Sequence, residues 1–226
     1  RVGAGIMPGW RDLPPAEELR RLLGVRIVVV DNDANLGALA EHSRGAARGC
    51  ADLIYVKLAS GVGAGIVLGG RLHRGATGIA GELGHVQVDE NGEVCRCGNR
   101  GCLETLAGAS RLRELLQPAF PEPLTGDRIL ALDAQGDPEV RRVLGDAGRA
   151  VGRALADLCN NLNPERVVLG GSIGTSTSLI DAVRTTLTRY AQPDTVAALQ
   201  VIPGELGDRA EVLGAVALAV SRSSTI

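Results

Sequence analysis

Apolar residues in the second half of the chain recur at helical spacing. Between residues 137 and 163 they are three or four positions apart, which is typical of one long helix with a single buried face. These residues are Val143, Ala147, Val151, Ala154, Leu158 and Leu162. The helix is predicted to end at Asn163, because Pro164 follows and disfavours helical backbone in the residue before it. Similar patterns predict helices over 15–23, 33–49 and 177–190, and a last helix that reaches Val220.

Short runs of β-branched residues predict the strands. They begin the segments 26–31, 53–59, 64–70, 166–172 and 199–203. The runs 53–59 and 64–70 flank a glycine-rich turn and predict a hairpin, which a third short strand extends. Strands that alternate with helices predict the α/β class with a mixed sheet. Residues 75–108 are rich in glycine, cysteine and charge, and predict a loop that a ligand organises.

Composition excludes several classes of function. The chain has 226 residues, of which 45% are hydrophobic, so it can build a sizeable core. Its formal net charge of −2 argues against nucleic-acid binding by phosphate neutralisation in this stretch. Aromatic residues are only 2%, so a polar ligand must be held by hydrogen bonds. No apolar run reaches the roughly 18 residues of a membrane span and no targeting peptide is recognisable, so we expect a cytoplasmic protein without membrane contact.

Three cysteines lie close together in the irregular segment. With one upstream histidine they form the ligand set of a closed tetrahedral zinc site: His85, Cys95, Cys97 and Cys102. Thiolates favour zinc over magnesium or calcium, and this loop has too few apolar residues to order itself. The alternative is a set of free thiols on the surface. Cys50 and Cys159 lie in helical segments and are expected to be ordinary core residues.

Two groups of carboxylates are candidates for ligand binding. Asp31, Asn32 and Asp33 lie where a predicted strand gives way to a helix, a position at which side chains face a cleft. A carboxylate there can accept a proton from a hydroxyl, although one of the two aspartates can equally serve only as a helix cap. Glu82 and Glu104 flank the cysteine loop, so a bound metal would position them. Their alternative role is that of exposed surface carboxylates.

Two glycine-rich turns are candidates for phosphate or nucleotide binding. Residues 60–65 read SGVGAG between two strands, and glycine there lets backbone N–H groups approach an anion. Gly170 and Gly171 follow a strand and can admit the adenosine part of a nucleotide. Tight turns without a ligand would look the same, and the lysine of a P-loop is absent.

Taken together, these motifs resemble the ROK family of bacterial repressors and sugar kinases. The resemblance rests on DNDAN at 31–35, SGVGAG at 60–65, RGATGIAGELGH at 74–85, the cysteine block at 95–104 and VVLGG at 167–171. It implies the actin-like ATPase (ribonuclease H-like) fold, with two lobes around a cleft. Residues 1–50 would be the remnant of an incomplete N-terminal lobe, and 51–226 the C-terminal lobe with a zinc loop at 85–104.

The resemblance also implies roles for individual residues. Asp33 corresponds to the general base for phosphoryl transfer to a sugar hydroxyl. The sugar contacts would be Asn32, Asp33, Glu82, His85 and Glu104, with His85 ligating structural zinc as well. The nucleotide contacts would be Ser60, Gly61, Gly63, Gly170 and Gly171.

The sequence departs from both branches of that family at its start. It contains neither the D-x-G-G-T-like phosphate loop of the kinases nor the winged helix-turn-helix of the repressors, so it resembles a truncated portion of a longer protein. Ala59 and Ala64 stand where the kinases carry glycines, which favours sugar binding over ATP turnover.

Three functions follow from these observations as hypotheses. The favoured one is the sugar-sensing effector domain of a ROK transcriptional regulator, homodimeric, with DNA contacted only through a domain outside this chain. The alternative is an ATP- and Mg²⁺-dependent kinase of glucose or an N-acetylhexosamine. The third is a zinc-stabilised dimerisation scaffold with a degenerate cleft.

Overall fold

A single five-stranded sheet forms the centre of the molecule. A computed structural model describes residues 14–223. Strand order is β3 (Arg71–His73), β2 (Val62–Leu68), β1 (Leu53–Leu58), β4 (Arg166–Gly170) and β5 (Gln200–Pro203). Strands β1, β2 and β3 run antiparallel as the predicted meander, whereas β1, β4 and β5 run parallel. The mixed sheet confirms the predicted α/β class.

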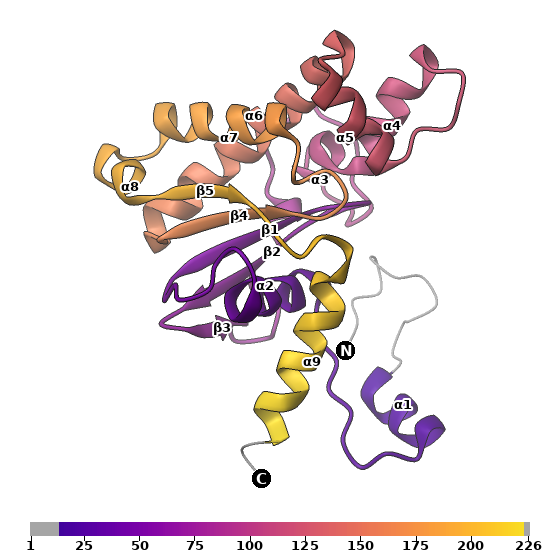
Figure 1. The fold of residues 1–226 in the computed structure, drawn as a ribbon, viewed down its shortest axis with the longest axis vertical. Coiled ribbons are helices and arrows are strands. Elements are labelled where there is room, and N and C mark those ends of the chain that lie inside the picture. Colours follow the sequence, from indigo (N-terminus) through magenta and orange to yellow (C-terminus); the bar gives the residue numbers. More distant parts are fainter. Residues whose placement is uncertain (1–13, 224–226) are drawn as a thin grey trace.

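Helices cover both faces of this sheet (Figure 1). Helices α6 (Pro138–Leu162) and α7 (Thr177–Tyr190) lie on one face, and α2 (Asp33–Arg44) and α9 (Ala210–Ser223) lie on the other. Side chains alternate along β1 as a strand buried on both faces requires. Ile54 and Val56 join the core on the α6 side, and Leu53 and Tyr55 join the core on the α2 side.

The long helix α6 packs against its neighbour α7 along the length of α7. A Cβ atom added at Gly148 would lie 2.4 Å from the carbonyl oxygen of Leu179, and one at Gly152 would lie 2.7 Å from Thr186 Cβ. These glycines therefore let the two helices approach closely, which offsets their cost within a helix.

Short elements complete the fold. They are α3 (Glu104–Ala107), α4 (Ala109–Leu116), α5 (Gly126–Gln135), α8 (Pro193–Ala198) and the 3₁₀ turns η1 (Leu83–His85), η2 (Gln117–Ala119) and η3 (Gly207–Arg209). Among the helices of residues 14–223, none combines the length and apolar composition that a bilayer crossing requires.

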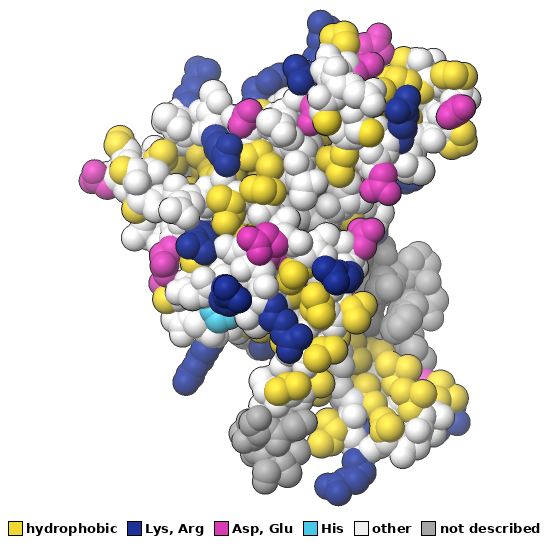
Figure 2. All heavy atoms as spheres, in the orientation of Figure 1, with side chains coloured by type: hydrophobic (Ala, Val, Ile, Leu, Met, Phe, Trp, Pro, Cys, Tyr) yellow, Lys and Arg dark blue, Asp and Glu magenta, His cyan; other side chains and the backbone are white. Residues whose placement is uncertain are grey.

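The strand predicted at 26–31 is not formed. Helix α1 (Pro15–Leu23) is present as predicted, but the chain from residue 25 to α2 pairs with no strand of the described part. A strand needs a neighbour to satisfy its backbone, and without one a β-branched run stays irregular. Val25, Ile27, Val29 and Val30 are consequently exposed. Figure 2 shows further apolar side chains gathered over α1 and the adjoining face of α9.

Candidate functional site

The start of β2 is the framework on which the predicted site residues converge. The turn that carries Glu82 lies against it, because the amide of Ala64 donates to the carbonyl oxygen of Gly81 over 2.8 Å. A Cβ atom at Gly81 or Gly84 would lie 2.0 Å from the carbonyl oxygen of Ala64 or Val62, respectively. The two glycines around Glu82 therefore allow this turn to contact the strand, and a side chain at either position would prevent that contact.

Helix α2 approaches the same strand from the other side. The carbonyl oxygen of Ala34 would lie 2.4 Å from a Cβ atom at Gly65, and the methyl group of Ala34 would lie 3.3 Å from one at Gly63. The first turn of α2, which carries Asn32 and Asp33, is thus seated on the N-terminal half of β2. Segments far apart in the sequence meet around four residues of one strand.

The three cysteines and the histidine form one compact cluster. A ligand atom from each of His85, Cys95, Cys97 and Cys102 lies within 4.8 Å of the others. Zn–S bonds of about 2.3 Å place two sulfurs of a tetrahedral site about 3.8 Å apart. The Cys97 and Cys102 sulfurs are 3.7 Å apart, and the Cys95 sulfur lies 3.6 Å from His85 Nδ1. The residues present therefore fit a tetrahedral zinc ion in both chemistry and spacing.

Metal binding at this cluster requires the loss of a proton from a buried thiol. The side chain of Cys102 is fully buried, and this burial, with hydrogen bonds from the neighbouring thiols, raises its pKa to about 12. Without a cation the cluster therefore holds at least this group as a neutral thiol, and metal binding must release its proton.

The two ring nitrogens of His85 face different partners. Nδ1 faces the sulfur cluster, whereas Nε2 lies 3.7 Å from Glu82 Oε2. A metal-bound imidazole commonly directs its other nitrogen at a carboxylate. The geometry is thus compatible with the predicted double role of His85, as a ligand through one nitrogen and a sugar contact through the other.

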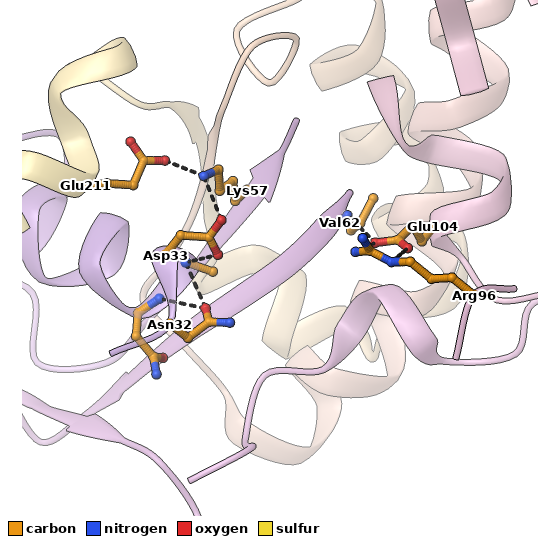
Figure 3. A network of polar contacts seen from close by, with 9 residues as sticks. Asn32, Asp33, Lys57, Val62, Arg96, Glu104 and Glu211 are labelled. Atoms are coloured by element: carbon orange, nitrogen blue, oxygen red, sulfur yellow. Dashed lines mark hydrogen bonds and ion pairs between the residues drawn. The ribbon is translucent and has the colours of Figure 1, made fainter. Parts of the chain in front are cut away.

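A lysine lies between the predicted base and a second carboxylate (Figure 3). Lys57 Nζ, on β1, is 2.9 Å from Asp33 Oδ2 and 2.6 Å from Glu211 Oε1, on α9. Burial lowers the pKa of Lys57, but its hydrogen bonds to both carboxylates outweigh this and raise it. Asp33 Oδ1 accepts the amide of Ala34 over 2.8 Å, and 61% of the Asp33 side chain is exposed.

The helix cap is Asn32, not an aspartate. Its Oδ1 accepts the amides of Ala34 and Asn35 over 2.8 and 3.3 Å, so its amide nitrogen is left to donate to a ligand. Asp31 instead accepts Asn35 Nδ2 over 2.8 Å and pairs with Arg74 from beyond β3. Of the triplet, only Asn32 and Asp33 keep groups available for a ligand.

Glu104, the last predicted sugar contact, is held by three donors (Figure 3). It begins α3, and Arg96 forms a fork with it, with Nε 2.8 Å from Oε1 and Nη2 3.0 Å from Oε2. The backbone amide of Val62 donates to Oε2 over 3.1 Å. The Glu104 side chain is only 11% exposed, so its carboxylate is fixed in place.

Comparison with known proteins decides the family. A family model described as the ROK family matches residues 6–222. The chain belongs to the ROK family. Its membership confirms the predicted actin-like fold, and the five-stranded mixed sheet agrees with it.

Relatives within the ROK family carry two kinds of name. Thermotoga maritima glucokinase is 32% identical over 230 residues, covering 95% of this chain and 72% of that protein. Bacillus subtilis xylose repressor is 32% identical over 206 residues, covering 91% of this chain and 53% of that protein. A crystal structure of a Streptomyces griseus ROK family glucokinase with glucose and AMPPNP has a TM-score of 0.84 at 31% identity, covering 94% and 74% of the two chains. The chain thus spans about half the length of the repressor, and membership of the ROK family does not by itself separate the two functions.

Close packing also explains the two glycines at the end of β4. A Cβ atom at Gly170 would lie 2.5 Å from the Tyr55 hydroxyl oxygen, and one at Gly171, where φ is +82°, would lie 2.5 Å from the carbonyl oxygen of Leu58. Both residues hold the end of β4 against β1. A role for them, or for Ser60, Gly61 and Gly63, in nucleotide binding stays a prediction.

Sequence reasoning missed the basic residues of this ROK site. Lys57 and Arg96 each pair with a predicted ligand-binding carboxylate, and Glu211 shares Lys57. Arg96 stands between two cysteines of the metal loop, and Lys57 is a charged residue within an apolar strand. A lysine in a strand that is predicted to be buried could have indicated this contact, because a buried charge requires a charged partner.

Proposed function

We propose that this chain is the sugar-sensing effector region of a ROK transcriptional regulator, whose DNA-binding domain lies outside these 226 residues. The observation that carries the proposal is the ion pair between Lys57 and Asp33. A general base must be free to take a proton from the acceptor hydroxyl. Here one Asp33 oxygen accepts a backbone amide and the other accepts an ammonium group.

The ammonium group changes what Asp33 offers to a ligand. The ammonium group donates to Oδ2 and the amide of Ala34 donates to Oδ1, so both oxygens are already engaged as hydrogen-bond acceptors before any ligand binds. Lys57 is in turn held by Glu211, so it is fixed rather than a mobile surface lysine. Such a carboxylate suits recognition of a sugar hydroxyl better than its deprotonation.

The sugar would be bound by acceptors and donors from several elements. Its contacts are Asn32, Asp33, Glu82, His85 and Glu104. Xylose and glucose, named for the repressor and glucokinase relatives, are the first candidates. A sugar can shift the arrangement of the lobes only by binding one arrangement more tightly, and that shift would reposition the DNA-binding domains of a cytoplasmic homodimer.

Zinc would have a structural role in this proposal. His85, Cys95, Cys97 and Cys102 would hold it, and when bound it supplies the cross-link that orders the loop between Glu82 and Glu104. The remaining work is done by the chain itself, in which the two flanking glutamates present acceptors to the ligand.

An ATP- and Mg²⁺-dependent sugar kinase is the second candidate function. It is supported by the glucokinase relatives and by the exposure of Asp33 at the N-terminus of α2. In that case Asp33 takes the proton of the acceptor hydroxyl, and Ser60, Gly61, Gly63, Gly170 and Gly171 lie along the nucleotide.

Calorimetry with the whole protein that carries this chain tests the sugar binding that the sensor requires. Glucose, xylose and N-acetylhexosamines are titrated without nucleotide, and we expect one of them to bind. Asp33→Asn should weaken that binding by about tenfold, because one charged acceptor is lost. No binding by any sugar in the zinc-loaded protein contradicts the sensor.

A coupled assay of ADP release tests the kinase. For a sensor, ADP release with the bound sugar and MgATP stays at the level without sugar, in both wild type and Lys57→Met. Release that depends on sugar and disappears in Asp33→Asn establishes the kinase instead. ATP turnover indifferent to Asp33 excludes this kinase mechanism.

A further inference from the structure

Arg96 projects from the metal loop toward the sugar site. It stands between Cys95 and Cys97, in a turn closed by hydrogen bonds from Cys95 N to Asn99 O over 2.7 Å and from Gly98 N to Cys95 O over 2.9 Å. Two ligands of the cluster therefore hold the backbone on either side of this arginine. The direction of its side chain depends on the order of the loop.

The fork of Arg96 fixes the orientation of the Glu104 carboxylate. A guanidinium group engages both carboxylate oxygens in one plane, which an ammonium group cannot do. The arginine is 52% exposed, so the ion pair itself contributes little to stability. Its effect is geometric, because it sets the rotation of a carboxylate that is mostly buried.

The same carboxylate closes the glycine turn between β1 and β2. Glu104 Oε2 accepts the amide of Val62, and a Cβ atom at Gly61 would lie 2.3 Å from this oxygen and 3.0 Å from Arg96 Nη2. The turn is also fastened from behind, because the amide of Ala109 donates to the carbonyl oxygen of Ala59 over 2.7 Å. Loop, helix α3 and glycine turn thus meet at one carboxylate.

We infer that Arg96 is a positioning residue that couples the metal loop to the sugar site and the glycine turn through Glu104. A carboxylate has about four acceptor positions, and three are filled here by Arg96 and Val62. One remains, in a fixed direction, for a sugar hydroxyl. The sugar part of this inference rests on the proposed function, whereas the coupling between loop and turn does not.

Hydrogen–deuterium exchange of the whole protein tests the coupling without any sugar. In the wild type, a chelator should increase exchange in peptides that cover 85–104 and also in those that cover 58–64. In Arg96→Ala, we expect faster exchange at 58–64 from the start and no further increase with chelator. Arg100→Ala is the matched control, because this loop arginine donates to the carbonyl oxygen of Gly92 and does not contact Glu104.

Sugar titration tests the consequence for binding. Arg96→Ala, with the same metal content as the wild type, should bind the sugar about tenfold more weakly, and Arg96→Lys should recover only part of that loss. In a Glu104→Gln background, Arg96→Ala should have no further effect on the dissociation constant.

The results that overturn the inference are separate from those that overturn the sensor. If no sugar binds to the wild type, the proposed function fails while the exchange experiment still decides the coupling. If chelator changes 58–64 equally in Arg96→Ala and the wild type, or if the two substitutions have additive effects on sugar affinity, Arg96 does not act through Glu104.

Discussion

Replacing Cys102 by serine should empty the metal site and disorder the loop around it. The side chain is fully buried among the other ligands, and a serine hydroxyl is a poor ligand for zinc. Between residues 86 and 100 the only buried side chain is that of Cys95, and only Val88 packs against the apolar core, so little besides the metal holds this stretch. We expect bound zinc to fall from about one per chain to near zero, with loss of exchange protection across 85–104.

Cys159→Ala is the control for this experiment. Cys159 is equally buried but lies on α6 away from the cluster, and burial raises its pKa to about 12. Elemental analysis should find wild-type zinc in Cys159→Ala, and the loop should keep its protection. Retention of metal and of loop protection in Cys102→Ser would exclude the site as assigned.

The cluster could be predicted from sequence because its determinants are local. Three cysteines and their glycines lie within eight residues, and the reach of the chain leaves few ways to arrange them. Helix α6 was predictable for a similar reason, since its apolar spacing and Pro164 specify a helix without any partner.

The rest depends on contacts between distant segments. Lys57 meets Glu211, and Arg74 meets Asp31, across long sequence separations that no spacing rule encodes. For the run 26–31 the sequence predicted a strand that does not form, because a β-branched composition indicates only that a strand is possible. A strand forms when a neighbour supplies hydrogen bonds, and none of the described strands does so there.

One such long-range contact is made by a buried carboxylate near the predicted adenosine turn. Asp133, on α5, is 3% exposed and accepts the hydroxyl of Ser176 over 2.7 Å and that of Ser178. Ser176 caps α7 by accepting the amide of Leu179 over 3.1 Å. The network therefore fastens the start of α7, and with it the chain that leaves Gly171, to helix α5.

Asp133→Ala should lower the free energy of unfolding by about 3 kcal/mol. It leaves the buried hydroxyl of Ser176 without its acceptor, at a cost of about 1–3 kcal/mol, and it removes the acceptor of the half-buried hydroxyl and amide of Ser178 as well. Urea unfolding with an unchanged m-value measures this loss.

Asp181→Ala removes an exposed α7 carboxylate that pairs with Arg184 over 3.2 Å, and should cost less than about 1 kcal/mol. Asp133→Asn, which keeps one acceptor oxygen, should fall between the two. Equal losses in Asp133→Ala and Asp181→Ala would show that the network adds nothing beyond a surface ion pair. The start of α7 would then be held chiefly by the Ser176 cap and by the apolar contacts of Leu179 and Ile180.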